Sequence, residues 1–125
     1  MKLEQATNMD ARVGMYESLA IGSNDYIAII FDASAANTWR LEASKEGTAA
    51  SDVGAVADTN WHIFRVIWLT DTSVEWFIDD VSQGTIATSA NIPIVQLQPV
   101  ISVFTEEAGA HYIDVDYLKV WQDRS

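Results

Sequence analysis

The feature that most limits the fold of this chain is a series of short segments rich in Val, Ile, Thr, Tyr, Phe and Trp, separated at fairly regular intervals by clusters of Gly, Asn, Asp and Ser. This pattern is typical of an antiparallel sandwich or barrel. No helix-period segment of useful length, internal repeat or low-complexity tract accompanies it. Strands are expected at Arg12–Ser18, Tyr26–Asp32, Thr38–Ser44, Ala49–Ala57, Trp61–Thr70, Val74–Asp79, Thr85–Thr88, Val100–Thr105 and Tyr112–Gln122.

The segments between the expected strands carry residues that suit tight reversals, since Asn, Asp and Ser hydrogen-bond to nearby backbone and Gly tolerates unusual backbone angles. Pro93 and Pro99 bracket Ile94–Gln98. Because proline cannot donate to a ladder, this piece is expected at a sheet edge or in a crossover. Turns are expected at Ser23–Asp25, Lys45–Gly47, Asp58–Asn60, Asp71–Ser73, Ser82–Gly84 and Glu106–Gly109.

Length and composition favour one domain over residues 1–125. A chain of 125 residues that is 49% hydrophobic can form one good core, and at this size about two-thirds of the unfolded surface becomes buried. The absence of cysteine fits the cytosol and equally a secreted or virion protein. Glu4 stands where a signal peptide needs apolar residues, and the longest apolar run, Tyr26–Phe31, is too short to span a bilayer, so no membrane partner is expected.

The charge balance argues against nucleic acid and anionic membranes as partners. Seven Lys and Arg stand against eighteen Asp and Glu, which gives a formal net charge of −11, and the basic residues are scattered along the chain. Net charge of this size is explained by solubility. The alternative explanation is binding of a cation or of a basic partner.

The most informative stretch is an expected hairpin that joins Trp61–Trp68 to Val74–Asp80 through the Asp71–Ser73 turn. Side chains alternate across a sheet, so this first strand places two sets on opposite faces. Both sets are mostly apolar, which predicts a central strand covered by the second sheet on one side and by a groove or a partner on the other. The sets are His62, Phe64, Val66 and Trp68 on one face, and Trp61, Ile63, Arg65 and Ile67 on the other.

This hairpin resembles that of concanavalin A-like glucanases and lectins, in which an aromatic-His-x-aromatic-x-Val/Ile-x-Trp strand precedes a Trp-aromatic-Ile-Asp strand. Asp114–Trp121 is similar to their closing Asp-Tyr-Val-x-Val strand. The resemblance covers roughly the second half of the chain, and Arg12–Tyr16 and Trp39–Ala43 match earlier strands more loosely. It implies an all-β fold, a two-sheet antiparallel jelly-roll sandwich. Short acidic modules rich in Ala and Thr are also similar in style to phage structural proteins.

The catalytic pattern of the glucanases does not occur in this sequence. Their three acids stand on one strand as Glu-x-Asp-x-x-Glu, whereas Glu42 and Glu75 are isolated acids. Glycoside hydrolysis needs a carboxyl pair at a defined separation. His62 and His111 lack suitably spaced zinc-binding partners, and neither a Gly-x-Ser-x-Gly motif nor a phosphate-binding glycine loop is present. We therefore assign no catalytic residue and do not expect an enzyme.

Three residues are the candidates for a ligand-binding platform, namely Trp39, Trp61 and Arg65. Stacking on a glycan is the functional interpretation, and packing or a protein interface is the alternative. The other tryptophans, Trp68, Trp76 and Trp121, are expected in the core, because each indole buries a large area and a single N–H. His62 is expected to be a hydrogen-bonded core or rim histidine.

Asp114 and Asp116 are the candidate metal ligands. On a strand they share a face with Leu118 and Val120, so at least one carboxylate begins on a half-buried side and must be paired, hydrogen-bonded or metal-bound. The resemblance implies a structural calcium held by an Asp of the closing strand. The alternative is that these carboxylates cap the N–H groups of a turn at the sheet edge.

Three functions from different classes fit these observations: a virion structural or surface module such as a capsid decoration or tail-associated protein, a carbohydrate-binding module with an aromatic groove, and a degenerate hydrolase. The first is favoured because 125 residues is short for this fold and the chain starts at what would be an inner strand. A sheet that lacks its outer strand exposes an edge, which natural proteins cover or pair. We expect a homo-oligomer or larger protein assembly, with glycan as the alternative partner, in a virion or extracellular setting.

Overall fold

The computed structural model describes residues 1–4, 9–18, 24–33, 37–69, 72–105, 108 and 110–120. Its described residues form strands and one short 3-10 turn, η1 (Ser89–Asn91). The strands are β1 (Lys2–Leu3), β2 (Met9–Tyr16), β3 (Tyr26–Asp32), β4 (Thr38–Lys45), β5 (Thr48–Val56), β6 (Phe64–Leu69), β7 (Ser73–Ile78), β8 (Val81–Ile86), β9 (Gln98–Thr105) and β10 (Ile113–Asp114). Among these residues, the structure contains no helix with the length and apolarity needed to cross a membrane.

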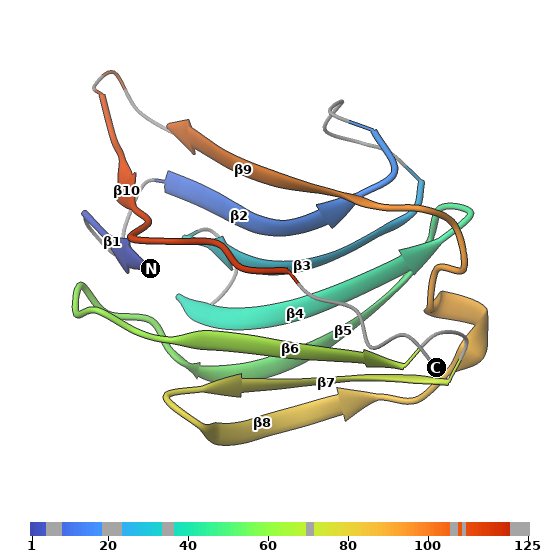
Figure 1. The fold of residues 1–125 in the computed structure, drawn as a ribbon. Coiled ribbons are helices and arrows are strands. Elements are labelled where there is room, and N and C mark those ends of the chain that lie inside the picture. The colour runs from blue at the N-terminus through green and yellow to red at the C-terminus, as the bar shows by residue number, and fades with distance from the viewer. Residues whose placement is uncertain are drawn as a thin grey trace.

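Two antiparallel sheets pack face to face (Figure 1), which confirms the predicted all-β, two-sheet jelly-roll sandwich. The larger sheet has the order β5-β4-β3-β2-β9. Its β4–β5 hairpin closes through Glu46 and Gly47, whose φ angles are 50° and 80°. Such a two-residue turn needs positive φ at both positions, which Gly adopts without strain. The turn expected at Lys45–Gly47 is therefore confirmed.

The smaller sheet has the order β6-β7-β8 and corrects two predictions. The turn expected at Ser82–Gly84 lies inside β8, and the β7–β8 reversal falls at Asp79 and Asp80, which have φ angles of 51° and 64°. The strand expected at Trp61–Thr70 begins at Phe64 and lies at the edge of the described sheet rather than at its centre. Apolar residues on both faces of a strand predict what packs above and below it. They do not indicate whether the strand has a hydrogen-bonded neighbour on each side, and β6 has one on the β7 side only among the described strands.

The core lies between the sheets and follows the period-2 alternation of the strands. From the larger sheet, β2, β3 and β4 direct alternate apolar side chains inward in register. From the smaller sheet, β7 contributes three buried side chains, and Phe64 and Trp68 of β6 pack against the cluster. Trp76 is confirmed as a core residue, whereas Trp121 lies outside the described residues. The inward rows include Ala11, Phe31 and Trp39, then Ile29 and Leu41, then Val74, Trp76 and Ile78.

The outer face of the larger sheet is a packed polar layer over a small apolar patch. Tyr16 and Tyr26 stack with ring centroids 5.2 Å apart, and the Tyr26 hydroxyl donates to Glu42. Arg40 lies 3.6 Å from the Asp32 carboxylate. These side chains surround Ile30, which is buried although it points away from the core. The layer explains how β3 is apolar on both faces without lying between two sheets.

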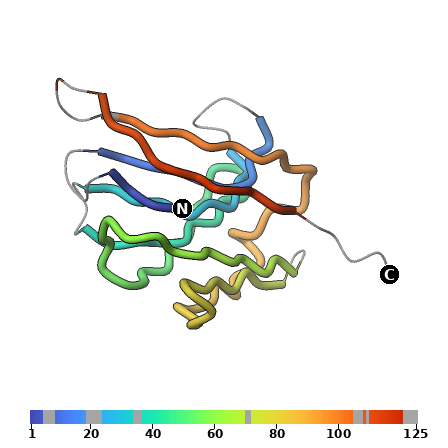
Figure 2. The backbone as a smooth tube through the Cα atoms, turned by 60° about the vertical axis from the view of Figure 1, so that its left-hand side comes forward, coloured from blue at the N-terminus to red at the C-terminus, as the bar shows by residue number. Residues whose placement is uncertain are grey.

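The closing strand expected at Tyr112–Gln122 is much shorter in the structure. Within residues 112–120, the part of this stretch that the structure describes, only Ile113 and Asp114 form a strand, β10, which pairs with β1 in a small second ladder. The segment that follows runs in the same layer as the smaller sheet, on the β6 side (Figures 1 and 2). Among the described residues it makes no ladder with β6. Met1, which precedes β1, bonds to the start of the β6 segment, since its ammonium donates to the His62 carbonyl at 2.7 Å and its carbonyl accepts from the His62 N–H at 3.0 Å. Beyond this point the two edges are separated by the hollow described below.

Candidate functional site

The three predicted platform residues lie in three different environments. Trp39 is 1% exposed, with its ring 5.6 Å from that of Phe31 and 4.7 Å from that of Phe64, so its prediction as an exposed residue is wrong. It shares the inward face of β4 with Leu41, which the alternation of that strand requires. Trp61 is 54% exposed in the segment before β6. The structure therefore does not form one platform from the three.

Arg65 points away from the core on β6. Its guanidinium carbon lies 3.9 Å from the centroid of the Phe77 ring, and one of its nitrogens lies 3.4 Å from the Asp80 carboxylate. Phe77 is its cross-strand partner on β7. Arg65 is thus held against its own sheet by a cation–π contact, on the opposite face from the hollow.

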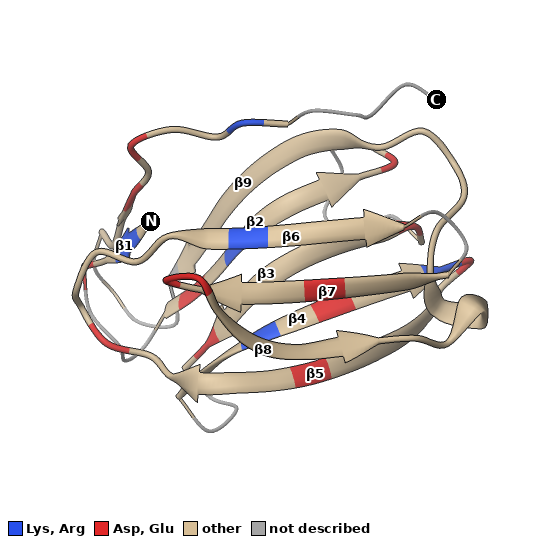
Figure 3. Ribbon diagram, turned by 60° about the horizontal axis from the view of Figure 1, so that its bottom comes forward, with Lys and Arg blue, Asp and Glu red and all other residues tan. Residues whose placement is uncertain are grey.

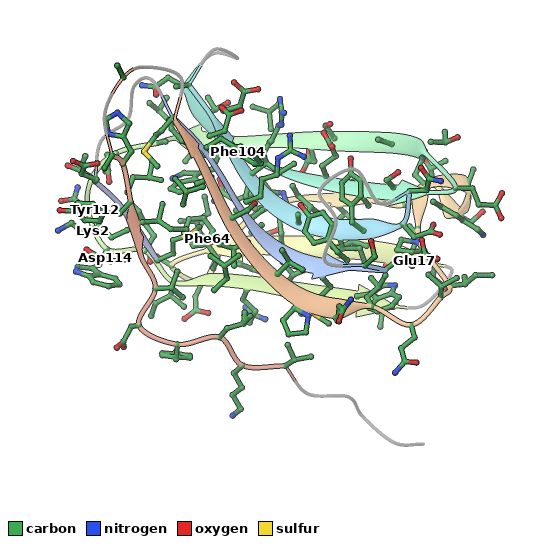
Figure 4. All side chains as sticks on the ribbon, turned by 90° about the horizontal axis from the view of Figure 1, so that it is seen from above. Lys2, Glu17, Phe64, Phe104, Tyr112 and Asp114 are labelled. Carbon is green, nitrogen blue, oxygen red and sulfur yellow. The ribbon has the colours of Figure 1, made fainter. Side chains whose placement is uncertain are left out.

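A hollow of about 390 Å³ opens between the inner face of the larger sheet and the start of β6. Val13 and Ile29 line it from β2 and β3, and Phe64 lines it from β6. In Figure 4, Phe64 lies within the body of the sandwich, whereas Lys2, Tyr112 and Asp114 gather at one end. The remaining lining residues are Met1, Trp61, His62, Ile63, Asp79, Val115, Asp116, Tyr117 and Leu118. Apolar side chains form most of this wall, and the ionisable ones lie together.

His62 organises the polar side of the hollow. Its Nδ1 lies 2.7 Å from Oδ2 of Asp79 and its Nε2 lies 2.9 Å from Oδ1 of Asp58. Asp79 also accepts from the backbone N–H of Ile63 at 2.8 Å, and Asp58 accepts from Asn60 at 2.7 Å. Two turns far apart in the sequence are therefore joined through one imidazole. This outcome confirms that His62 is a hydrogen-bonded rim histidine.

The charges of this cluster stabilise one another. Burial opposes protonation of His62, but its bonds to Asp79 and Asp58 raise its pKa overall. The Asn60 backbone N–H and the bond to His62 lower the pKa of Asp58 to about 2. The Ile63 backbone N–H and His62 likewise lower the pKa of Asp79. Because both imidazole nitrogens are occupied by carboxylates, the ring serves to connect these turns rather than to act as a free base.

The two candidate metal ligands are separated by the end of the ladder. Asp114 is half-buried on β10 opposite Lys2, whereas Asp116 is exposed and lines the hollow. The shared face expected for them does not form, because the strand ends at Asp114. Within the described ranges, no group of three His, Cys, Asp or Glu residues is placed to hold a metal ion. Calcium binding by Asp114 or Asp116 stays a prediction.

A second histidine secures the end of the sandwich near these aspartates. His111 Nδ1 lies 3.0 Å from Oε2 of Glu4, and the same carboxylate oxygen accepts from the Tyr112 backbone N–H at 3.3 Å. The Glu4 N–H in turn donates to the Tyr112 carbonyl at 3.2 Å. These bonds extend the β1–β10 ladder and fix the point from which residues 115–118 pass over the hollow.

Trp61, His62 and Asp116, which the sequence singles out, all line the hollow, but two of the aspartates around them are not predicted as members of a site. The sequence predicts Asp58 only as a turn residue and Asp79 only as the end of the strand Val74–Asp79, and it predicts Val115–Leu118 as part of the closing strand. The Asp58–His62 spacing and the Asp79–Asp80 pair at a hairpin end are signals that could have identified the cluster. Neither a protein-family model nor a curated protein sequence matches this chain. The hollow, with its apolar wall and its acidic rim, is therefore the feature of the molecule that bears on function.

Proposed function

We propose that this chain is a non-catalytic jelly-roll module that works by protein–protein assembly, as a structural or surface component of a virion such as a capsid decoration or tail-associated protein. The observation that carries the proposal is the apolar rim of the hollow, where Trp61, Ile63 and Leu118 are 54%, 60% and 44% exposed. Monomers rarely leave such side chains gathered together unless they bind something. The virion or extracellular setting follows from the likeness to phage modules.

The polar groups of the hollow favour a protein partner over a sugar. Sites for small polar ligands combine an apolar wall with polar groups directed at the ligand. Here His62 has both nitrogens bonded within the protein, and both oxygens of Asp79 also have partners. Few groups at this rim thus remain for the many hydroxyls of a glycan. Apolar side chains of a protein partner can pack against the apolar wall of the hollow without further hydrogen-bonding groups.

A carbohydrate-binding module is the alternative, and one observation favours it. Trp61 presents an exposed indole at the rim of a concave surface, which is the arrangement on which a pyranose ring stacks. Assembly of the module includes binding of a second copy of this chain, which light scattering detects.

The test compares two binding panels, a peptide-display library and a glycan array, on three proteins. They are the wild type, the rim variant Trp61→Ser/Ile63→Ser, and a matched control, Val53→Ser/Val56→Ser, which removes exposed apolar surface from β5. Light scattering of the same samples detects self-association. We expect peptide binding or self-association that the rim variant loses and the control keeps. Glycan binding that depends on Trp61, in a monomer that binds no peptide, would establish the alternative.

A further inference from the structure

The connection between β5 and β6, residues 57–63, carries two of the exposed rim residues, Trp61 and Ile63. Ala57, at its start, is buried, and Ile63, at its end, accepts from the Asp79 N–H through its carbonyl at 2.8 Å. No residue of this connection belongs to a strand. The position of the rim therefore depends mainly on the bonds that the side chains of this connection make.

The ring of His62 makes two of these bonds. Nε2 bonds within the connection to Asp58, and Nδ1 bonds to Asp79 in the acidic turn between β7 and β8 (Figure 3). An ionised carboxylate only accepts hydrogen bonds, so both ring nitrogens must donate. Both carry hydrogen only in the imidazolium form, whereas the neutral ring has one N–H and one lone pair. Loss of a proton therefore breaks one of the two bonds, because a lone pair this close to a carboxylate oxygen repels it.

The charged groups around the ring favour the imidazolium form. Asp58 faces it from its own connection and Asp79 from the β7–β8 turn, and Asp116 lines the same hollow from the segment that follows β10. The Met1 ammonium opposes them and donates to the His62 carbonyl at 2.7 Å. Burial lowers the pKa of His62, but the bonds to the two carboxylates raise it overall above its ordinary value of 6.5. The side chain is 18% exposed, so the ring exchanges protons with solvent.

We propose that the ring of His62 is a proton-dependent link, which holds residues 58–63 in the conformation that binds a partner while both nitrogens are protonated and frees them at one anchor when a proton is lost. The proposal rests on the proposed function and specifies how binding at that site is regulated. A binding-competent conformation that is only partly populated weakens the apparent affinity in proportion. Assembly through Trp61 and Ile63 should therefore strengthen as pH falls through the titration of His62.

The decisive variant is Asp79→Asn, because the two oxygens of Asp79 have separate partners. Oδ1 accepts from the Ile63 N–H at 2.8 Å, and Oδ2 faces Nδ1 of His62. The introduced amide keeps the first bond with its oxygen and donates from its nitrogen to a ring nitrogen that carries a lone pair. The variant should thus hold the rim with the neutral ring and free it with the imidazolium, which reverses the wild-type behaviour. Asparagine tolerates the φ of 51° at this position, so the turn should fold.

Nuclear magnetic resonance measures the link without any partner. Ring shifts report the protonation of His62, and hydrogen exchange at the Asn60 and Ile63 amides reports how firmly the rim is held, since both donate to the carboxylates that the ring joins. Protection factors remove the intrinsic pH dependence of exchange. As pH rises through the His62 titration, protection of at least one of these amides should fall about tenfold, the effect of one hydrogen bond to a charged group. The Gly47 amide, bonded in another hairpin, should not respond.

Two further variants separate the ring from its ionisable neighbours. Burial lowers the pKa of the Met1 amine below its ordinary value of 8.0, so this group also titrates in the range of interest. His62→Gln keeps that amine, and any pH dependence that survives this substitution belongs to Met1. Asp80→Asn makes the matched change at the neighbouring turn residue, which bonds to Arg65, and should keep the wild-type profile.

Binding is then measured on both sides of the His62 titration with a peptide recovered from the display library, chosen to carry no group that titrates in this range. We expect tighter binding by the wild type on the acid side, by up to about tenfold, and by Asp79→Asn on the alkaline side. Constant protection of both amides through the titration, or the same direction of change in wild type and Asp79→Asn, would overturn the link. Amides that respond while the peptide affinity stays constant would overturn its role in regulation. If neither panel detects a ligand, the proposed function fails, and the amide measurements still decide the link.

Discussion

The two lateral edges of the sandwich are built differently. At one, β5 and β8 lie side by side (Figures 1 and 3) and are joined by side chains. Trp76 Nε1 donates to Asp52 Oδ2 at 2.8 Å across the sheets. Gly54 makes room for this contact, since a Cβ atom there would lie 2.5 Å from the Trp76 ring. The sheets close here because small and large residues face each other.

At the other edge, β6 and residues 115–118 remain apart, with the hollow between them. Trp61 lies exposed at this rim, and the polar cluster of His62 joins turns at one end only. A buried tryptophan and a half-buried aspartate thus form a hydrogen-bonded pair at the closed edge, while the same residue types face solvent at the open edge. The two edges differ in what lies opposite the smaller sheet. At the closed edge β5 provides Gly54, which leaves room for the Trp76 ring, and Asp52, which accepts its hydrogen bond. At the open edge residues 115–118 form no ladder with β6.

The largest effect should come from removing the tryptophan of the closed edge. Trp76 is fully buried, so Trp76→Ala should lower the free energy of unfolding by about 3–5 kcal/mol through lost burial and a cavity. The same substitution at Trp61 should cost only about 0.5 kcal/mol, as expected for an exposed side chain. Urea unfolding followed by circular dichroism measures both. Equal losses would show that the open edge is packed as tightly as the closed one.

Asp52→Ala should produce the next largest effect. It leaves the indole N–H of Trp76 buried without its acceptor, which costs about 1–3 kcal/mol. Asp52→Asn retains an oxygen acceptor and should lose less. Glu46→Ala, in an exposed turn, is the control and should leave the urea midpoint unchanged. If Asp52→Asn were as damaging as Asp52→Ala, charge rather than hydrogen bonding would hold this edge.

The sequence predicted the architecture because period-2 alternation is a local property. The strand expected at Tyr26–Asp32 coincides with β3, and the Lys45–Gly47 turn is correct, since both depend on neighbouring residues only. The turn predicted at Ser82–Gly84 is wrong because Gly84 is typical of turns but here lies within β8, where it leaves space for Asp52 of the other sheet. A Cβ atom at Gly84 would lie 1.9 Å from the Asp52 carboxylate, a constraint that arises only in the folded structure.

The candidate site was less predictable for the same reason. Alternation placed Trp39 and Trp61 on strands, but it did not indicate which face the other sheet would cover. Trp39 faces Phe64 of the opposite sheet, whereas Trp61 precedes its strand and has no facing sheet. The His62 cluster combines the β5–β6 connection between the two sheets with the turn of the β7–β8 hairpin, so its geometry depends on packing that no single segment encodes.

The His62 cluster should make stability depend on pH at the open edge. The raised pKa of His62 gives stabilisation that is complete below its ordinary value of 6.5 and is lost as pH rises through the folded value. The lowered pKa values of Asp58 and Asp79 give stabilisation that is complete above their ordinary value of 3.8 and is lost as pH falls. The cluster's contribution should therefore be largest between pH 3.8 and 6.5.

Urea unfolding across this pH range, on wild type and His62→Gln, measures that contribution. The difference between their midpoints should be largest near pH 5 and should shrink on both sides. Asp80→Asn changes the neighbouring turn residue, which is bonded to Arg65 rather than to His62, and should keep the wild-type pH profile. A constant difference between wild type and His62→Gln across the range would mean that the ring acts by packing alone.

The smallest effect should come from Arg65→Ala on the outer face of β6. Its two contacts, with the Phe77 ring and with Asp80, are both at the surface, and the Asp80 side chain is 83% exposed. Exposed cation–π contacts contribute about 0.5–1 kcal/mol and exposed ion pairs less. High salt should screen the ion pair with Asp80 but leave the contact with the Phe77 ring. If Arg65→Ala still lowers the free energy of unfolding in high salt, and if Arg65→Lys restores only part of it, the stabilisation comes from the Phe77 ring. A loss comparable to that of Trp76→Ala would instead mean that β6 is held by its outer face, and the contrast between a closed and an open edge would then have to be abandoned.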